Sequence, residues 1–251
     1  MLGWGRAILL QLAHPLVAAG VDDHSTFRAH PLAPVQRLHA TIQTMLALTF
    51  GTPADMAGAA QRINRIHDRV HGTLGESAGR FRAGTPYSAH DPELLAWVEL
   101  TLLDSLPLAY ETFIGPLSGA DKDAWCLEAR ANADLLGVPP ESIPRSYEAL
   151  HADVENRIRG GELAVGAVAR RLARSVLYSP LVSLAWPWSR LNRIATIGLL
   201  PPAIRDGYGL TWTKADARAL DRWARACRTV AARTPAAVRR WRAARRGHGP
   251  M

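Results

Sequence analysis

Cysteine is scarce in this chain, with two in 251 residues. Cys126 and Cys227 lie about a hundred positions apart and offer no disulfide framework, so the sequence predicts a reducing, cytoplasmic compartment. The sequence also lacks an uninterrupted apolar run of the ~20 residues that a membrane-spanning helix requires. Walker-loop, GxGxxG and paired CxxC motifs are missing as well, which leaves P-loop and dinucleotide chemistry without support.

The chain has fewer acidic than basic residues: 22 Asp and Glu against 30 Lys and Arg, which gives a net charge of +8. Ten arginines follow Lys214: Arg218, Arg222, Arg225, Arg228, Arg233, Arg239, Arg240, Arg242, Arg245 and Arg246. We expect residues 1–234 to form one domain and residues 235–251 a disordered, solvated basic tail. A second interpretation is peripheral contact of this tail with an anionic membrane. No aromatic ladder is interleaved with the arginines, so no nucleic-acid partner is expected.

Turn and capping residues divide the chain into helices, while the sustained alternation typical of strands is absent. The apolar first 20 residues resemble a secretion signal only superficially, and we expect a buried helix divided at Pro15. Asp91 and Pro92 begin a long helix that is bent or broken near Pro107, and Thr213 caps the last one. Further predicted helices cover 35–50, 54–72, 94–115, 121–136, 145–159, 162–178 and 213–232, with loops at 20–34 and 72–87. The sequence therefore predicts an all-α fold with a single multi-helix globular domain.

The segment AAQRINRIHDRVHGTL (59–74) places His67 on an apolar helical stripe shared with Met56, Ile63, Val70 and Leu74. His71, one turn later, falls at the rim of that stripe. A buried imidazole needs a hydrogen-bond partner or a metal. Two histidines four apart can share a zinc ion, but Asp68 stands where HExxH enzymes have glutamate, which weakens a hydrolase interpretation. A histidine on an apolar face can also bind haem iron from one side, and the alternative is an ordinary core histidine.

Arg37, Thr41 and Thr44 line up beside the apolar stripe of the predicted helix 35–50. An arginine and hydroxyl groups in that position can bind a carboxylate or orient an oxygen-bearing ligand. The alternative is a packed arginine stem with threonines bonded to the backbone. His14 and His24, one in an apolar helix and one in a polar loop, suggest a pocket edge or two ordinary structural histidines.

Five strings occur in a fixed order along the chain: QLAHPLVAAGVDDHSTF, RLHATIQTMLALTFG, RIHDRVHGT, PYSAHDPELLAWVELTLLDS and LPPAIRDGYGLTW. Together they resemble the MpaB-type oxygenase family, which shares its catalytic domain with the bacterial rubber oxygenases (latex-clearing proteins). The similarity spans residues 7–212. The resemblance implies a helical domain enclosing a haem pocket with one haem b. It also implies a dioxygen-dependent reaction on an unsaturated, isoprenoid-like lipophilic molecule.

The resemblance also implies site residues. His67 matches the iron ligand best, with His71 the second choice, and the family's arginine–threonine pair falls on Arg37 and Thr41. His14 and His24 are further candidates for the cofactor pocket. The chain departs from its relatives at Ala40, where rubber oxygenases have lysine, and at Glu99, where relatives carry histidine. The alternative function is a non-catalytic haem-binding or lipophile-binding protein of the same fold.

Overall fold

Helix α1 (Trp4–Leu12) lies at the centre of the computed structural model, which describes residues 3–24, 40, 43–44, 46–178 and 188–235. It packs against the long helix α5 (Pro92–Phe113) on one side and against α8 and α10 on the other. Its side chains Ala7, Leu9 and Leu10 are completely buried. An apolar segment near the N-terminus therefore forms core, as the sequence predicts.

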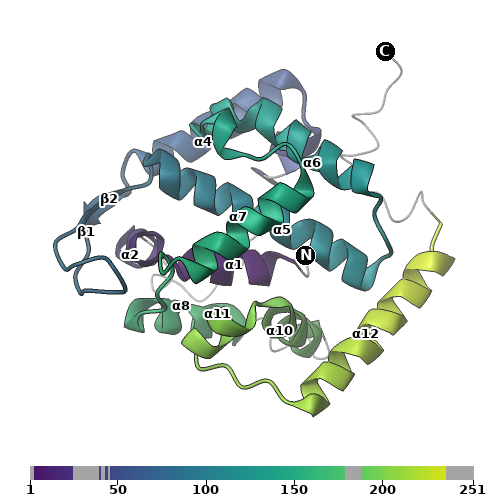
Figure 1. The fold of residues 1–251 in the computed structure, drawn as a ribbon. Helices are drawn as coiled ribbons and strands as arrows, with labels where there is room; N and C mark the ends of the chain where they lie inside the picture. The colour runs from purple at the N-terminus through teal and green to yellow at the C-terminus, as the bar shows by residue number, and fades with distance from the viewer. Residues whose placement is uncertain (1–2, 25–39, 41–42, 45, 179–187, 236–251) are drawn as a thin grey trace.

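The other helices form two layers above and below α1 (Figure 1). One layer contains α4 (Pro53–His67), α6 (Gly119–Asn132), α7 (Tyr147–Arg159) and the 3-10 turns η1 (Ala133–Leu136) and η2 (Pro140–Ser142). The other contains α8 (Ala167–Leu177), α10 (Trp188–Leu199), α11 (Pro202–Gly207) and α12 (Lys214–Arg233). Helix α2 (Pro15–His24) continues from α1 toward a small hairpin of β1 (His71–Thr73) and β2 (Pro86–Ser88), in which Gly72 pairs with Tyr87. The all-α prediction is confirmed, with this hairpin as an addition.

Capping residues explain where several helices begin. The Asp91 carboxylate accepts hydrogen bonds from the backbone N–H groups of Glu93 and Leu94, and Pro92 occupies the first helical position. Thr213 and Asp216 cap each other's backbone at the start of α12. At the end of η1, Gly137 adopts a φ of 75°, a conformation that glycine tolerates without a Cβ clash. The predicted boundaries at Asp91, Thr213 and Gly137 are confirmed.

Several boundaries differ from prediction. Helix α4 ends at His67 rather than at residue 72, and Val70 and Leu74 lie beyond it. Residues 20–24 belong to α2 rather than to a loop, and α5 continues unbroken through Pro107. Half of the predicted helix 35–50 and nearly all of the predicted tail 235–251 lie outside the described residues, and residues 40, 43–44 and 46–50 of that helix are helical as predicted. In the described ranges, no helix has both the length and the apolar character needed to cross a membrane.

A buried ion pair joins the two central helices. Arg6 Nη2 lies 2.6 Å from Asp104 Oδ2, with both side chains at most 2% exposed. The Arg6 guanidinium also donates to Ser105 Oγ and to the carbonyl of Leu199 at the end of α10. On its other side, Asp104 accepts a hydrogen bond from Nδ1 of His151 at 2.7 Å. One carboxylate thus connects α1, α5 and α7, and the arginine extends the network to α10.

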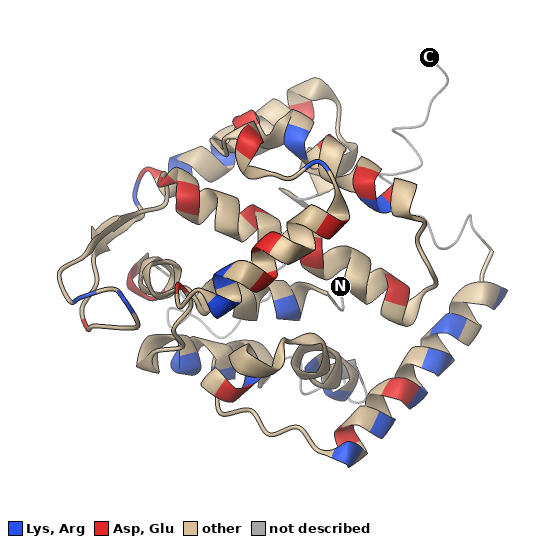
Figure 2. Ribbon diagram, in the orientation of Figure 1, with Lys and Arg blue, Asp and Glu red and all other residues tan. Residues whose placement is uncertain are grey.

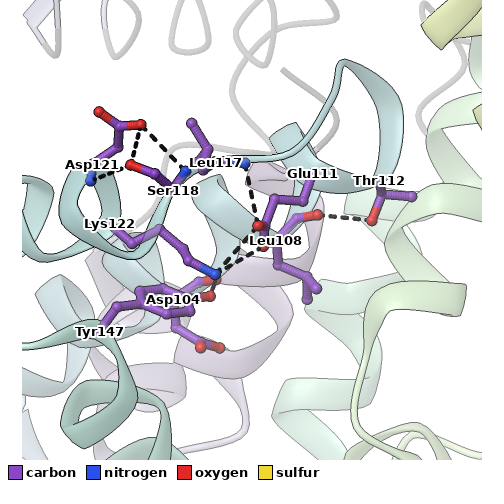
Figure 3. Close-up of polar contacts among 9 residues, drawn as sticks. All are labelled: Asp104, Leu108, Glu111, Thr112, Leu117, Ser118, Asp121, Lys122 and Tyr147. Atoms are coloured by element: carbon purple, nitrogen blue, oxygen red, sulfur yellow. Dashed lines mark hydrogen bonds and ion pairs between the residues drawn. The ribbon is translucent and has the colours of Figure 1, made fainter.

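Helices α5, α6 and α7 meet around Lys122 (Figure 3). The ammonium group of Lys122 lies 3.2 Å from Glu111 Oε1 and 5.2 Å from the ring centre of Tyr147. The Tyr147 hydroxyl donates to the backbone carbonyl of Asp104 at 3.1 Å. This contact sets α6 and α7 against the same half of α5.

Candidate functional site

His67 is the last residue of α4 and is half-buried. Its ring nitrogen Nδ1 is buried and has no hydrogen-bond partner among the described residues. Burial, followed by the neighbouring His90, lowers the pKa of His67, so its imidazole is neutral at neutral pH. The His90 ring stands edge-on at a centroid distance of 5.9 Å, and His90 Nε2 lies 2.8 Å from Asp68 Oδ1. His67 thus has the neutral ring and free lone pair that a metal ligand requires.

His71 does not share a helix face with His67, because α4 ends between them. It lies in β1 and is exposed, so the predicted spacing of one helical turn is not formed. Its carbonyl accepts a hydrogen bond from His24 Nε2 at 3.1 Å. The contact joins the C-terminal end of α2 to the hairpin. Beside it, the Tyr87 hydroxyl donates to Asp23, and burial raises the pKa of Tyr87.

His14 lies in the turn between α1 and α2 and is 6% exposed. Its Nδ1 is also buried without a partner, and the ring packs 5.1 Å from that of Phe81. Burial lowers its pKa to about 4. His14 and His24 lie at opposite ends of α2, about 15 Å apart along the axis, so they cannot bind one metal ion together. His14 shares the free ring nitrogen of His67 but is enclosed by protein.

The predicted pair Arg37 and Thr41 lies outside the described residues. Between them Ala40 is helical and exposed. The structure therefore gives the arrangement of the candidate histidines but not that of the arginine–threonine pair. In the described part of the chain, no group of three or more His, Cys, Asp or Glu side chains could hold a metal ion. Haem iron fits such a position, because the macrocycle supplies most of its ligands and only one protein nitrogen is needed on one side.

Glu99 lies on the face of α5 between the buried Leu95 and Leu103, one turn away on either side. Leu95 approaches Gly137 at the end of η1, and η1 packs against α4. Glu99 is thus on the side of α5 that faces the layer containing His67. Burial raises its pKa to about 7, so the carboxyl can gain or lose a proton near neutral pH.

Other chemical groups are placed away from His67. Ser77 belongs to the string GESAG (75–79), which matches the GxSxG pattern of hydrolases. The pattern requires a strand-to-helix turn, whereas Ser77 is exposed in the hairpin loop and accepts a hydrogen bond from the Ala83 amide. A hollow of about 610 Å³ lies between the start of α5, η2 and α7. Its lining includes Arg80, Glu93, Arg157 and Glu162 and none of the predicted site residues.

The sequence analysis missed the network of Arg6, Asp104 and His151. Its only sequence signals are single charges inside apolar helices, at Arg6 in GRAILL and at Asp104 in LLDSL. His151 is 46% exposed, while its Nδ1 is oriented by a fully buried carboxylate. The arrangement fixes the tautomer of His151, but with Arg6 sharing the same carboxylate its clearest role is structural.

Comparison with known proteins identifies a family for this chain. Residues 1–232 match the family described as ER-bound oxygenase mpaB/B'/Rubber oxygenase, catalytic domain. The uncharacterized proteins Rv2237 of Mycobacterium tuberculosis and Mb2261 of Mycobacterium bovis are each 28% identical to this chain over 219 residues, covering 84% of the chain and 80% of each relative. No solved structure matches. Because the family match covers nearly the whole described domain, the chain belongs to the family of mpaB-type and rubber oxygenase catalytic domains.

Proposed function

We propose that this chain is a haem b-dependent oxygenase that uses dioxygen to oxidise an unsaturated, isoprenoid-like lipophilic molecule. Membership of an oxygenase family supports the reaction class. The observation that carries the cofactor assignment is the free, buried Nδ1 of His67. A haem iron supplies the redox chemistry for dioxygen when it is bound, and the chain's own groups determine how it is held.

His67 is the group that would hold the iron. A neutral imidazole has one ring nitrogen with an available lone pair, and burial keeps His67 in that form. His67 is partly exposed as a residue although its Nδ1 is buried, so iron would reach this nitrogen only after neighbouring side chains move, whereas His14 is 6% exposed and packs on Phe81. We therefore assign the ligand role to His67 and a structural role to His14 and His71.

Other groups would help to bind the haem and to transfer protons. In this proposal Arg37 would pair with a haem propionate or donate a hydrogen bond to dioxygen, and Thr41 would supply a nearby hydroxyl. Glu99 can hold or release a proton near pH 7 on the side of α5 that faces the α4 layer.

The cofactor assignment is tested by absorption spectroscopy. The full chain, produced with haem available, should show a Soret band and about one haem per chain in a pyridine haemochrome assay. His67→Gly should lose the band, and added imidazole should restore it by occupying the vacated position. His71→Ala is the matched control and should keep the band. Full haem content in His67→Gly without imidazole would show that the ligand assignment is wrong.

The reaction class is tested with a pair of probes that differ only in their double bonds. Squalene should cause oxygen uptake by the haem-loaded protein, and its saturated counterpart squalane should not. Haem binding without oxygen uptake on squalene or shorter isoprenoid alkenes would favour the alternative, a non-catalytic haem protein of the same fold. The alternative is supported by the exposed Ala40, which stands where rubber oxygenases have lysine.

A further inference from the structure

Helix α12 carries a row of cationic side chains on its outer face. Lys214, Arg218, Arg222, Arg225 and Arg233 fall within an arc of about 100° on the helix, and all five are exposed. Figure 2 shows these basic residues following one another along α12 at the edge of the molecule. Over its 20 residues the helix extends about 30 Å. The row is therefore long, nearly straight and open to solvent.

These charges are not used inside the protein. Among the described residues, Arg218, Arg222, Arg225 and Arg233 take part in no ion pair. The acidic Asp216 is occupied in capping the helix, which leaves Asp221 as the one exposed carboxylate of α12. Elsewhere the surface does pair its charges, for example Arg80 with Glu162 and Arg171 with Asp22. Other exposed arginines of the described chain, such as Arg62 and Arg65, are also outside these ion pairs, so it is the alignment of the α12 charges in one row that favours an anionic partner.

The opposite face of α12 holds the helix firmly in place. Ala219, Ala224 and Ala231 are buried, and the partly buried Leu220 and Trp223 pack on the cluster formed by α5 and α10. Arg228, at the edge of the row, donates to the carbonyl of Thr112 at 2.7 Å. The cationic row is thus presented by a rigid element, so little ordering entropy opposes binding.

Apolar side chains are exposed near the C-terminal end of the row. Val230 on α12 is 64% exposed, and the Arg228 contact brings this end beside the last turn of α5, where Tyr110 and Ile114 are 43% and 38% exposed. Basic residues next to exposed apolar groups are typical of surfaces that rest in the headgroup region of a membrane. Surfaces that bind single-stranded nucleic acid instead place aromatic rings among the cations, and the exposed face of α12 has none.

We propose that the outer face of α12 docks the protein on an anionic lipid surface. The docking requires neither the cofactor nor the reaction proposed above, although it would bring the domain to the phase in which lipophilic molecules dissolve. Each basic residue near such a surface strengthens binding about fivefold. Four arginines should together contribute roughly 600-fold if their effects are independent.

The test measures binding of the full chain to vesicles by co-sedimentation. Vesicles of phosphatidylcholine with about 30% phosphatidylglycerol should bind the protein, pure phosphatidylcholine vesicles should not, and added salt should weaken the binding. Arg218→Gln/Arg222→Gln/Arg225→Gln/Arg233→Gln should lose roughly 600-fold in affinity. The corresponding fourfold lysine variant keeps the charges and should bind like the original protein.

A matched control distinguishes the effect of the α12 arginines on vesicle binding from the effect of the protein's total charge. Arg62→Gln/Arg65→Gln/Arg82→Gln/Arg145→Gln removes the same number of exposed positive charges elsewhere and should bind almost normally. The proposal is overturned if this control loses as much affinity as the α12 variant. It is also overturned if the α12 variant binds normally, which would assign the contact to other residues such as those after 235. Tighter, α12-dependent binding of duplex DNA than of anionic vesicles would overturn the lipid assignment.

Discussion

Asp104→Asn is expected to destabilise the protein severely without removing a single apolar contact. The substitution keeps the size of the side chain but removes the charge that lies 2.6 Å from the Arg6 guanidinium. Arg6 is 2% exposed, so it cannot recover its lost partner from water. The hydrogen bond from His151 Nδ1 at 2.7 Å is weakened by the same change, because its acceptor loses its charge.

The size of the effect follows from the burial of both partners. Leaving one charge of a buried pair without its counter-charge costs about 3–5 kcal/mol. For a protein of this length that corresponds to a fall in Tm of roughly 6–20 °C. Arg6 retains its bonds to Ser105 Oγ and the Leu199 carbonyl, so we expect the lower half of both ranges.

The measurement is the free energy of unfolding from urea titrations followed by circular dichroism, supported by thermal melts. Asp153→Asn is the control, because Asp153 pairs with Arg157 at the surface, where such pairs contribute less than about 1 kcal/mol. The double variant Arg6→Met/Asp104→Leu should be more stable than Asp104→Asn, since it leaves no unpaired charge. A loss below about 1 kcal/mol in Asp104→Asn, or a double variant that is less stable than the single one, would refute the argument.

Three further predictions concern buried groups. Burial holds the pKa of His14 at about 4, against 6.5 in the unfolded chain, so the stability that depends on its neutral ring is complete above pH 6.5 and is lost as the pH falls toward 4. His14→Leu has no group at this position that titrates in this range. Between pH 6.5 and pH 4 its free energy of unfolding should therefore fall by up to about 3 kcal/mol less than that of the original protein. The pKa of Glu99 is raised from 4.5 to about 7 in the folded protein, so stability is lost as the pH rises through this interval. Glu99→Gln should be more stable than the original protein by about 1–3 kcal/mol at pH 8 and equally stable at pH 4. Equal stability at both pH values would contradict the raised pKa of Glu99. A Cβ on Gly5 would lie 2.0 Å from Thr196 Oγ1, so Gly5→Ala should cost about 1–3 kcal/mol in urea titrations, whereas Gly75→Ala, with nothing within 4 Å, should show no such clash cost.

Local sequence signals predicted those parts of the fold that depend on a few neighbouring residues. Two helix starts are set by hydrogen bonds between residues no more than three positions apart. They are the start of α5, at Asp91 and Pro92, and the start of α12, at Thr213 and Asp216. The end of α4 was predicted wrongly because Val70 and Leu74 happen to continue the helical period. In the structure these two side chains pack against α2 from a turn and a hairpin instead.

Long-range placement could not be predicted in the same way. Nothing near Arg6 in the sequence indicates that its partner lies in α5 or that a carbonyl 193 positions away accepts its N–H. For the candidate site, the sequence identified His67 as a ring in need of a partner, and its Nδ1 is indeed buried without one. Its role as an iron ligand and the roles of Arg37 and Thr41 stay predictions until the haem experiments are made.

The central position of α1 has a consequence for biosynthesis. This helix is synthesised well before its packing partners, because α10 and the Tyr208 hydroxyl, which donates to the Leu9 carbonyl, come almost 200 residues later. At about 5–20 residues per second, translation leaves the apolar face of α1 uncovered for roughly 10–40 s. Nascent chains of this protein should therefore depend on chaperones that shield an early apolar segment, and messages truncated before α10 should yield aggregates rather than a smaller domain.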